Sequence, residues 1–322
     1  MNNAGIWQEN SPYSKLLITV GIVFFSVVLF TTIALVLAML SLNVGYGELQ
    51  SILNDPENSR YLSLLKFVQT LSTIGMFVVP PLILAHLFSR HWPAYLFLNK
   101  KISLADVLLV LVVMFAAVPL INYLAELNEK MSLPPALGWL EKWMQEKESA
   151  ATDVTKKFLE VNTASGLMFN IFMIAFLPAV GEELFFRGIL QRIFTDWTKK
   201  VFLGIIISAA LFSALHMQFY GFLPRFLLGI LLSYLLVWSG SLWLPVTAHF
   251  INNASAVIML YLFRSGSIGL DPDKVGAESD TYSALVTGTL FMIAALWLLY
   301  RKLRLQRQNE DDEMQKQGEG EI

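Results

Sequence analysis

The sequence contains no cysteine, little charge and few histidines. None of its 322 residues is cysteine, only 15% are Asp, Glu, Lys or Arg, and four are histidine. The missing cysteines exclude disulfides, thiolate nucleophiles and cysteine-bound metals. Soluble domains contain about 25% charged residues, so the low fraction argues against a soluble enzyme or a disordered protein. The net charge of −2 provides no basic surface for nucleic acid, and no nucleic-acid partner is expected.

The sequence instead contains long runs of apolar residues. Hydrophobic residues make up 55% of the chain, and about 20 consecutive apolar residues suffice to cross a bilayer. The first run is too long for a cleaved signal peptide, so it is expected to remain as a helix. The sequence predicts an all-α, polytopic transmembrane bundle of about eight helices. The predicted spans are Leu16–Leu40, Leu62–Phe88, Leu104–Leu124, Gly166–Phe194, Val201–Met217, Phe222–Trp238, Leu242–Phe263 and Tyr282–Tyr300.

The distribution of lysine and arginine predicts the orientation. These residues are enriched in the short loops on the side of the N-terminus, so both termini are expected in the cytoplasm. An amphipathic helix is expected between two groups of spans, and the polar tail from Gln308 is expected to be disordered. The predicted parts are a cytoplasmic N-terminus (1–15), N-terminal transmembrane helices (16–125), an extramembrane amphipathic segment (126–163), a polar-bearing core (164–263), a loop with the last transmembrane helix (264–300) and a cytoplasmic charged tail (301–322).

Ionisable residues inside a span are costly and therefore mark candidate functional sites. The fourth span contains Gly181-Glu182-Glu183-Leu184-Phe185-Phe186-Arg187. Glu183 and Arg187 are spaced i,i+4, so they can form an ion pair on one helix face. Glu182 points about 100° away from them and has Phe186 at i+4, so its partner must come from another helix. The alternative is a buried charge network that only fixes packing.

Two more spans carry polar side chains. His216 lies at the end of the fifth span, where a lone histidine is more often interfacial. His249 and Asn253 are spaced i,i+4 in the seventh span and can face one site, although interhelical hydrogen bonds would explain them equally well. Pro178 lies one turn before Glu182, where a bend could bring these residues together.

Together these side chains fit hydrolysis by one of two mechanisms. Glu182, with help from His216, can take a proton from water, while His249 and Asn253 donate hydrogen bonds to the developing oxyanion. Alternatively, Glu182, His216 and His249 can bind zinc and leave a position open for water. The spacing does not separate these mechanisms. The sequence lacks the His-Glu-x-x-His, Gly-x-Ser-Gly and Gly-x-Gly-Asp motifs of other intramembrane proteases.

Three ordered motifs resemble the CAAX protease and bacteriocin-processing family. Glu182–Arg187 matches the Glu-Glu-x-x-x-Arg motif, Phe212–His216 matches Phe-x-x-x-His, and His249–Asn253 matches His-x-x-x-Asn. Each motif is weak alone, whereas the ordered set is specific. The family includes the CAAX prenyl endopeptidase of eukaryotes. The resemblance covers roughly Gly166–Phe263, and the first three spans and the last rest on hydropathy alone.

This resemblance implies an intramembrane endopeptidase whose helices surround a catalytic cavity. It implies a membrane-associated protein or peptide as substrate, the bilayer as partner and a bacterial plasma membrane as location. No cofactor is favoured, and zinc remains the alternative. A non-catalytic scaffold or bacteriocin-immunity protein is a further alternative, and the cavity is expected to open toward the cytoplasmic half. The implied roles are general base for Glu182, ion pair for Glu183 and Arg187, water activation for His216, and oxyanion contacts for His249 and Asn253.

Overall fold

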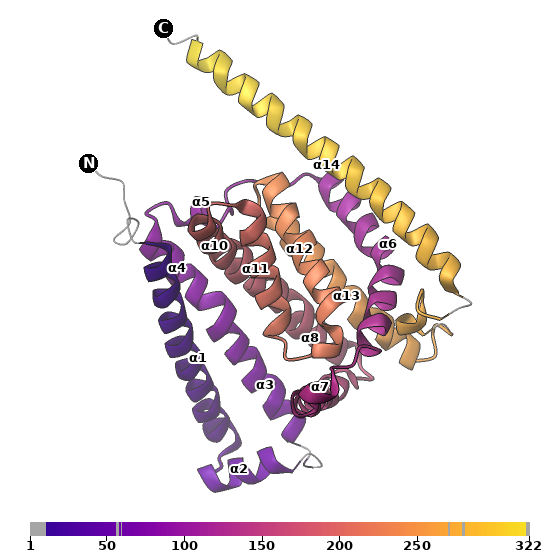
Figure 1. Cartoon of the computed structure of the whole chain (residues 1–322). Coiled ribbons are helices and arrows are strands. Elements are labelled where there is room, and N and C mark those ends of the chain that lie inside the picture. The colour runs from indigo at the N-terminus through magenta and orange to yellow at the C-terminus, as the bar shows by residue number, and fades with distance from the viewer. Residues whose placement is uncertain (1–10, 56–57, 59, 270, 279–280, 320–322) are drawn as a thin grey trace.

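The computed structural model is all-helical and describes residues 11–319, apart from 56–57, 59, 270 and 279–280 (Figure 1). Seven of its helices are long and apolar enough to cross a membrane, and an eighth apolar helix is shorter. All eight predicted spans are therefore helical, and the chain is a multi-pass membrane protein. The eight are α1 (Pro12–Leu42), α3 to α4 (Tyr61–Phe88), α6 (Leu104–Glu129), α8 to α10 (Ala164–Thr198), α11 (Val201–Ala214), η5 with α12 (Phe219–Ser239), α13 (Trp243–Arg264) and α14 (Tyr282–Glu319).

Two of the spans contain a π-helical segment followed by proline. The second span consists of α3 (Tyr61–Thr73), the π-helical segment η1 (Ile74–Val78) and α4 (Val79–Phe88), with Pro80 and Pro81 in α4. The fourth span is divided in the same way, with Pro178 two residues after the end of a π-helical segment. Proline has no N–H and displaces the carbonyl four residues earlier, so the wider π turn accommodates it. The parts of the fourth span are α8 (Ala164–Asn170), η3 (Ile171–Phe176), α9 (Leu177–Glu182), η4 (Glu183–Leu190) and α10 (Gln191–Thr198).

The fourth span and α11 form a tight helical hairpin. Lys199 ends α10 in the left-handed conformation (φ 57°), and α11 begins two residues later. Gly204 lies so close to α10 that an added Cβ would come within 2.8 Å of the Thr195 nitrogen. Glu183 precedes Lys199 by 16 residues and His216 follows Lys200 by 16 residues, so the hairpin brings them to the same level.

The predicted amphipathic segment is helix α7 (Gly138–Leu159), preceded by the short η2 (Pro135–Leu137). It lies across the end of the bundle opposite the start of α1 (Figure 1). Lys66 of α3 donates to the Phe158 carbonyl at 2.9 Å, and Asn170 of α8 donates to the same carbonyl at 2.7 Å. Lys66 also donates to Asn170 Oδ1 at 2.9 Å. These bonds fix the C-terminal end of α7 to two membrane helices.

Helix α14 corrects one expectation about the C-terminus. The tail from Gln308 was expected to be disordered, but α14 continues to Glu319. The tail has good helix formers and no glycine before Gly318, so the helix can continue beyond the membrane. The start of α1 and the end of α14 lie on the same face of the bundle (Figure 1). The remaining short helices are α2 (Tyr46–Asn54), α5 (Trp92–Tyr95) and η6 (Pro272–Lys274).

Candidate active site

A buried ion pair forms the base of the site. Arg187 Nη1 donates to Glu183 Oε1 at 2.9 Å, and both side chains are 0% exposed. Arg187 Nη2 donates to the carbonyl of Gly229 in α12 at 3.0 Å. A Cβ at Gly229 would lie 3.1 Å from the Cβ of Ala209, so the glycine permits this close approach of α12. The ion pair predicted from the i,i+4 spacing is thus present and also ties two helices together.

His249 of α13 is held by the same carboxylate. Its Nδ1 lies 2.8 Å from Glu183 Oε1, and the ring is 3% exposed. A carboxylate accepts a hydrogen bond, so Nδ1 carries the proton and Nε2 of the neutral ring carries a lone pair. Nε2 lies 3.9 Å from Glu182 Oε2. Glu183 therefore orients His249 toward Glu182 as well as neutralising Arg187.

His216 reaches Glu182 from the turn after α11. Its Nδ1 donates to the Phe212 carbonyl at 2.7 Å, which leaves the Nε2 lone pair 4.0 Å from Glu182 Oε2. The Phe212 ring is packed edge-on against the His216 and His249 rings, with centroids 5.0 and 5.8 Å away. The same ring lies 4.6 Å from the Arg187 guanidinium carbon. Phe212 thus packs against three site residues, which accounts for its place in the motif.

Glu182 is the convergence point of the site. Within the described part of the chain, its Oε2 is buried and has no hydrogen-bond partner. The distances of 3.9 and 4.0 Å to the two histidines are too long for direct hydrogen bonds. For a water oxygen about 2.8 Å from both Glu182 Oε2 and one histidine Nε2, the angle at the water between these two acceptor atoms would be roughly 90°. This is close to the angle between the two O–H bonds of the water. The two histidines that approach Glu182 most closely lie outside its own helix, His216 after α11 and His249 in α13.

Zinc coordination by Glu182, His216 and His249 would require shorter distances between these side chains. Tetrahedral zinc with bonds of about 2.0–2.1 Å brings its ligand atoms to about 3.3–3.4 Å from one another. The oxygen–nitrogen distances of Glu182 to His216 and His249 are longer than this by about 0.6 Å. No group of three or more His, Cys, Asp or Glu side chains in the described part of the chain is arranged to hold a metal ion. The fixed Nδ1 atoms, however, are typical of zinc-binding histidines.

Asn253 makes a different contact from the predicted one. Its Nδ2 donates to the Ile174 carbonyl at 3.2 Å, and its Oδ1 accepts a hydrogen bond from Asn252 at 3.1 Å. The Ile174 carbonyl is available because Pro178, four residues later, has no N–H to donate. In this structure Asn253 therefore fixes α13 to the bent fourth span. Its predicted oxyanion contact would use the second Nδ2 hydrogen and stays a prediction.

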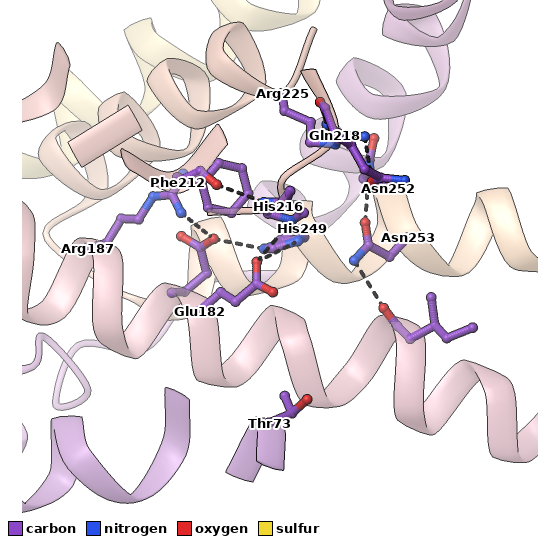
Figure 2. A network of polar contacts seen from close by, with 12 residues as sticks. Thr73, Glu182, Arg187, Phe212, His216, Gln218, Arg225, His249, Asn252 and Asn253 are labelled. Carbon is purple, nitrogen blue, oxygen red and sulfur yellow. Dashed lines mark hydrogen bonds and ion pairs between the residues drawn. The ribbon is translucent and has the colours of Figure 1, made fainter. Parts of the chain in front are cut away.

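The structure adds residues at the rim that the sequence analysis did not place in the site. Arg225, one turn into α12, donates to the carbonyl and to the Oε1 of Gln218, each at 2.7 Å. Gln218, Arg225, Asn252 and Asn253 lie on the His216 side of the site (Figure 2). One signal could have identified Arg225: it is an ionisable residue within the predicted span Phe222–Trp238.

The site opens on the side of His216. The His216 side chain is 30% exposed, against 11% for Glu182 and 3% for His249. His216 lies on the turn between α11 and α12, where Tyr220 N donates to Glu148 of α7 at 3.1 Å. Helix α7 covers the end of the bundle opposite the start of α1 (Figure 1). A cytoplasmic N-terminus and a cavity open toward the cytoplasm, both expected from the sequence, are therefore incompatible.

Comparisons with known proteins agree with the motif assignment. Residues 164–255 match the family model described as type II CAAX prenyl endopeptidase Rce1-like. The chain is 30% identical over 117 residues to the uncharacterized protein YpbD of Bacillus subtilis (strain 168), covering 35% of this chain and 55% of that protein. It is 33% identical over 102 residues to an uncharacterized 24.3 kDa protein of Escherichia coli, covering 30% of this chain and 46% of that protein. The chain thus spans about half the length of these curated relatives.

No solved structure matches the chain significantly. The family match begins where the predicted core begins and contains all three motifs. The segment at residues 164–255 therefore matches the Rce1-like family model, as the resemblance of its motifs predicted.

Proposed function

We propose that the chain is an intramembrane endopeptidase that hydrolyses peptide bonds of membrane-associated proteins or peptides by means of a glutamate-activated water. The position of Glu182 Oε2 carries this proposal. It is a buried acceptor without a hydrogen-bond partner among the described residues, 3.9 and 4.0 Å from two histidine Nε2 atoms. A water bound there would donate one hydrogen to the carboxylate and the other to a histidine. Its lone pair would then face the substrate carbonyl.

The proposed reaction conserves its protons. Glu182 takes a proton from the water as the oxygen attacks the carbonyl carbon, and a tetrahedral oxyanion forms. The carbon–nitrogen bond then breaks, and the same proton moves from Glu182 to the leaving amine. His249 can donate from Nε2 to the oxyanion only when it carries both ring protons, with Glu183 accepting the Nδ1 proton. The second Nδ2 hydrogen of Asn253 is the other candidate donor.

Replacement of Glu182 by glutamine tests the proposal. We expect Glu182→Gln to lower the cleavage rate by a factor of about 10² to 10⁴, because the amide cannot accept the proton. Glu146→Gln is the matched control, since Glu146 is an exposed glutamate of α7. Membranes from cells that produce either variant would be compared by mass spectrometry for an uncleaved membrane protein. Equal cleavage by both variants would rule out Glu182 as the base.

A zinc-dependent protease with the same residues is the second candidate. The observation that favours it is the hydrogen bonding of both Nδ1 atoms, which presents two Nε2 lone pairs to one carboxylate oxygen. We favour the metal-free mechanism because the Glu182–histidine distances are longer than zinc requires. Metal analysis and chelation separate the two mechanisms. Stoichiometric zinc that is lost together with activity, and restores it on return, would establish the zinc mechanism.

We further propose that the protein lies in a bacterial plasma membrane with both termini in the cytoplasm. The bacterial sources of its relatives support this location. The excess of lysine and arginine in the short loops on the side of the termini supports this orientation. The site would then be entered from the opposite side, beneath α7. Labelling of a single cysteine introduced on α7 would test this, because the natural sequence contains no cysteine. Labelling only from the cytoplasmic side would overturn it.

A further inference from the structure

Arg225 is the cation at the entrance of the site. It lies in the first turn of α12, and Figure 2 shows it beside Gln218 on the side where His216 is exposed. Asn252 and Asn253 line the same rim. A substrate that reaches Glu182 from this side must pass the rim, so the chemistry of Arg225 bears on which substrates enter.

The hydrogen bonds of Arg225 leave its charge uncompensated at short range. Its two bonds, from Nη1 and Nη2, both end on neutral oxygens of Gln218. A guanidinium has five N–H groups, so three remain. Within the described chain no carboxylate oxygen lies within 4.0 Å of an Arg225 nitrogen, whereas Arg187 is paired with Glu183 at 2.9 Å. The charges of Glu148 and Glu182 act on Arg225 only from farther away.

Glu148 makes its hydrogen bond with the backbone and not with Arg225. Its Oε2 accepts the backbone N–H of Tyr220 at 3.1 Å, and this bond holds the turn between α11 and α12 against α7. An arginine near the start of a membrane span, half-buried and without a close counter-ion, is costly. A ligand carboxylate would compensate this charge. The planar guanidinium can bind both oxygens of a carboxylate at once, which makes arginine selective for this group.

We propose that Arg225 binds a carboxylate of the peptide substrate near the scissile bond and thereby determines specificity. The inference rests on the proposed protease function and adds a substrate class to it. The carboxylate can be the C-terminus of the peptide or an Asp or Glu side chain. Both supply the same planar anion, and the experiment distinguishes them.

Binding to an inactive protein tests this inference without requiring cleavage. Full-length Glu182→Gln protein in detergent would be immobilised and exposed to a randomised pool of apolar octapeptides. The pool would be made in three forms: free C-terminal carboxylate, C-terminal carboxamide, and carboxamide with one internal aspartate. Retained peptides would be quantified by mass spectrometry. The same measurement would be made with Arg225→Gln, Arg225→Lys or Gln218→Ala added to Glu182→Gln.

We expect one carboxylate form to be retained at least about tenfold over the plain carboxamide. Which form is enriched identifies the source of the carboxylate. Arg225→Gln should bring the ratio to about one and Arg225→Lys should leave part of it, whereas Gln218→Ala should keep it because the charge remains. A merely structural role of Arg225 would lower the retention of all three forms equally and leave the ratio unchanged.

No enrichment in the Glu182→Gln protein, or equal enrichment after Arg225→Gln, would overturn the inference. Cleavage of the same pools by the wild-type protein is scored separately. Cleavage without a carboxylate preference contradicts only the role of Arg225. Carboxylate-selective binding without cleavage by the wild-type protein contradicts the protease function instead.

Discussion

Arg187→Met is the most informative perturbation of the buried charge network. The substitution keeps the length and apolar stem of the side chain but removes the cation that neutralises Glu183. Both partners are 0% exposed, and removing one member of a buried pair typically costs about 3–5 kcal/mol of unfolding free energy. The lost hydrogen bond to the Gly229 carbonyl adds about 1 kcal/mol. This sum is a large part of the stability of an ordinary protein, which is about 5–15 kcal/mol.

A double variant and a matched pair make the test specific. Glu183→Leu combined with Arg187→Met removes both charges of the buried pair and leaves neither partner unpaired, so we expect it to recover at least half of the lost stability. It should remain inactive, because His249 loses the carboxylate that orients it. The control is Lys130→Met, which breaks an i,i+4 pair with Glu126 on an exposed helix end. That change should leave the unfolding free energy unaltered within error.

Reversible unfolding in mixed micelles with increasing dodecyl sulfate would measure these differences. The eight tryptophans of the chain provide the fluorescence signal. Two results would refute the reasoning. One is an Arg187→Met variant as stable as the Lys130→Met variant. The other is a double variant at least as unstable as the Arg187 single variant, which would place the cost in packing rather than in the unpaired carboxylate.

Two further predictions concern the hairpin of α10 and α11 and the buried Tyr95, whose carbonyl accepts a hydrogen bond from Arg192 of α10. Gly204→Ala should lower the unfolding temperature by several degrees and reduce activity, because the added Cβ would clash with Thr195 and displace His216. Gly21→Ala is the control: a Cβ added there has no neighbouring atom within 4 Å, so both the unfolding temperature and the activity should stay unchanged. Burial raises the pKa of Tyr95 to about 12, so the neutral phenol stabilises the fold below the ordinary value near 10, and this contribution is lost between about pH 10 and 12. Tyr95→Phe should therefore weaken the decline in stability over that range, as measured by the same unfolding assay; an unchanged decline would contradict this assignment.

Hydropathy was sufficient to predict the membrane architecture. Each of the eight apolar runs forms a helix, because a chain in a bilayer must satisfy its backbone hydrogen bonds internally. The pair of Glu183 and Arg187 was equally predictable, since i,i+4 spacing depends only on helix geometry. The helical structure of the tail was not predictable from its low apolar content, because such a segment can also form an exposed helix when it contains good helix formers.

The depth of the site residues could not be read from the loops. Counted from the basic residues of each loop, Glu182 and His216 were about 15 and 24 Å deep at 1.5 Å per residue, so they did not appear level. The structure shows that α10 and α11 are joined by a tight turn at Lys199 and Lys200, with Glu183 16 residues before Lys199 and His216 16 residues after Lys200. Which basic residue marks the membrane boundary depends on packing, so the sequence alone could not show this.

The sequence by itself identified the residues that we propose to carry the chemistry, because charge and histidine are costly in apolar spans and few exceptions occur. Only the tertiary structure decided what each of them contacts. The turn after α10 and the proline-dependent bend before Glu182 set the distances from Glu182 to the two histidines. The same packing gave Asn253 the Ile174 carbonyl and placed Arg225 at the entrance. Those contacts join residues far apart in the chain, and helical periodicity, which relates only neighbours within a turn or two, contains no information about them.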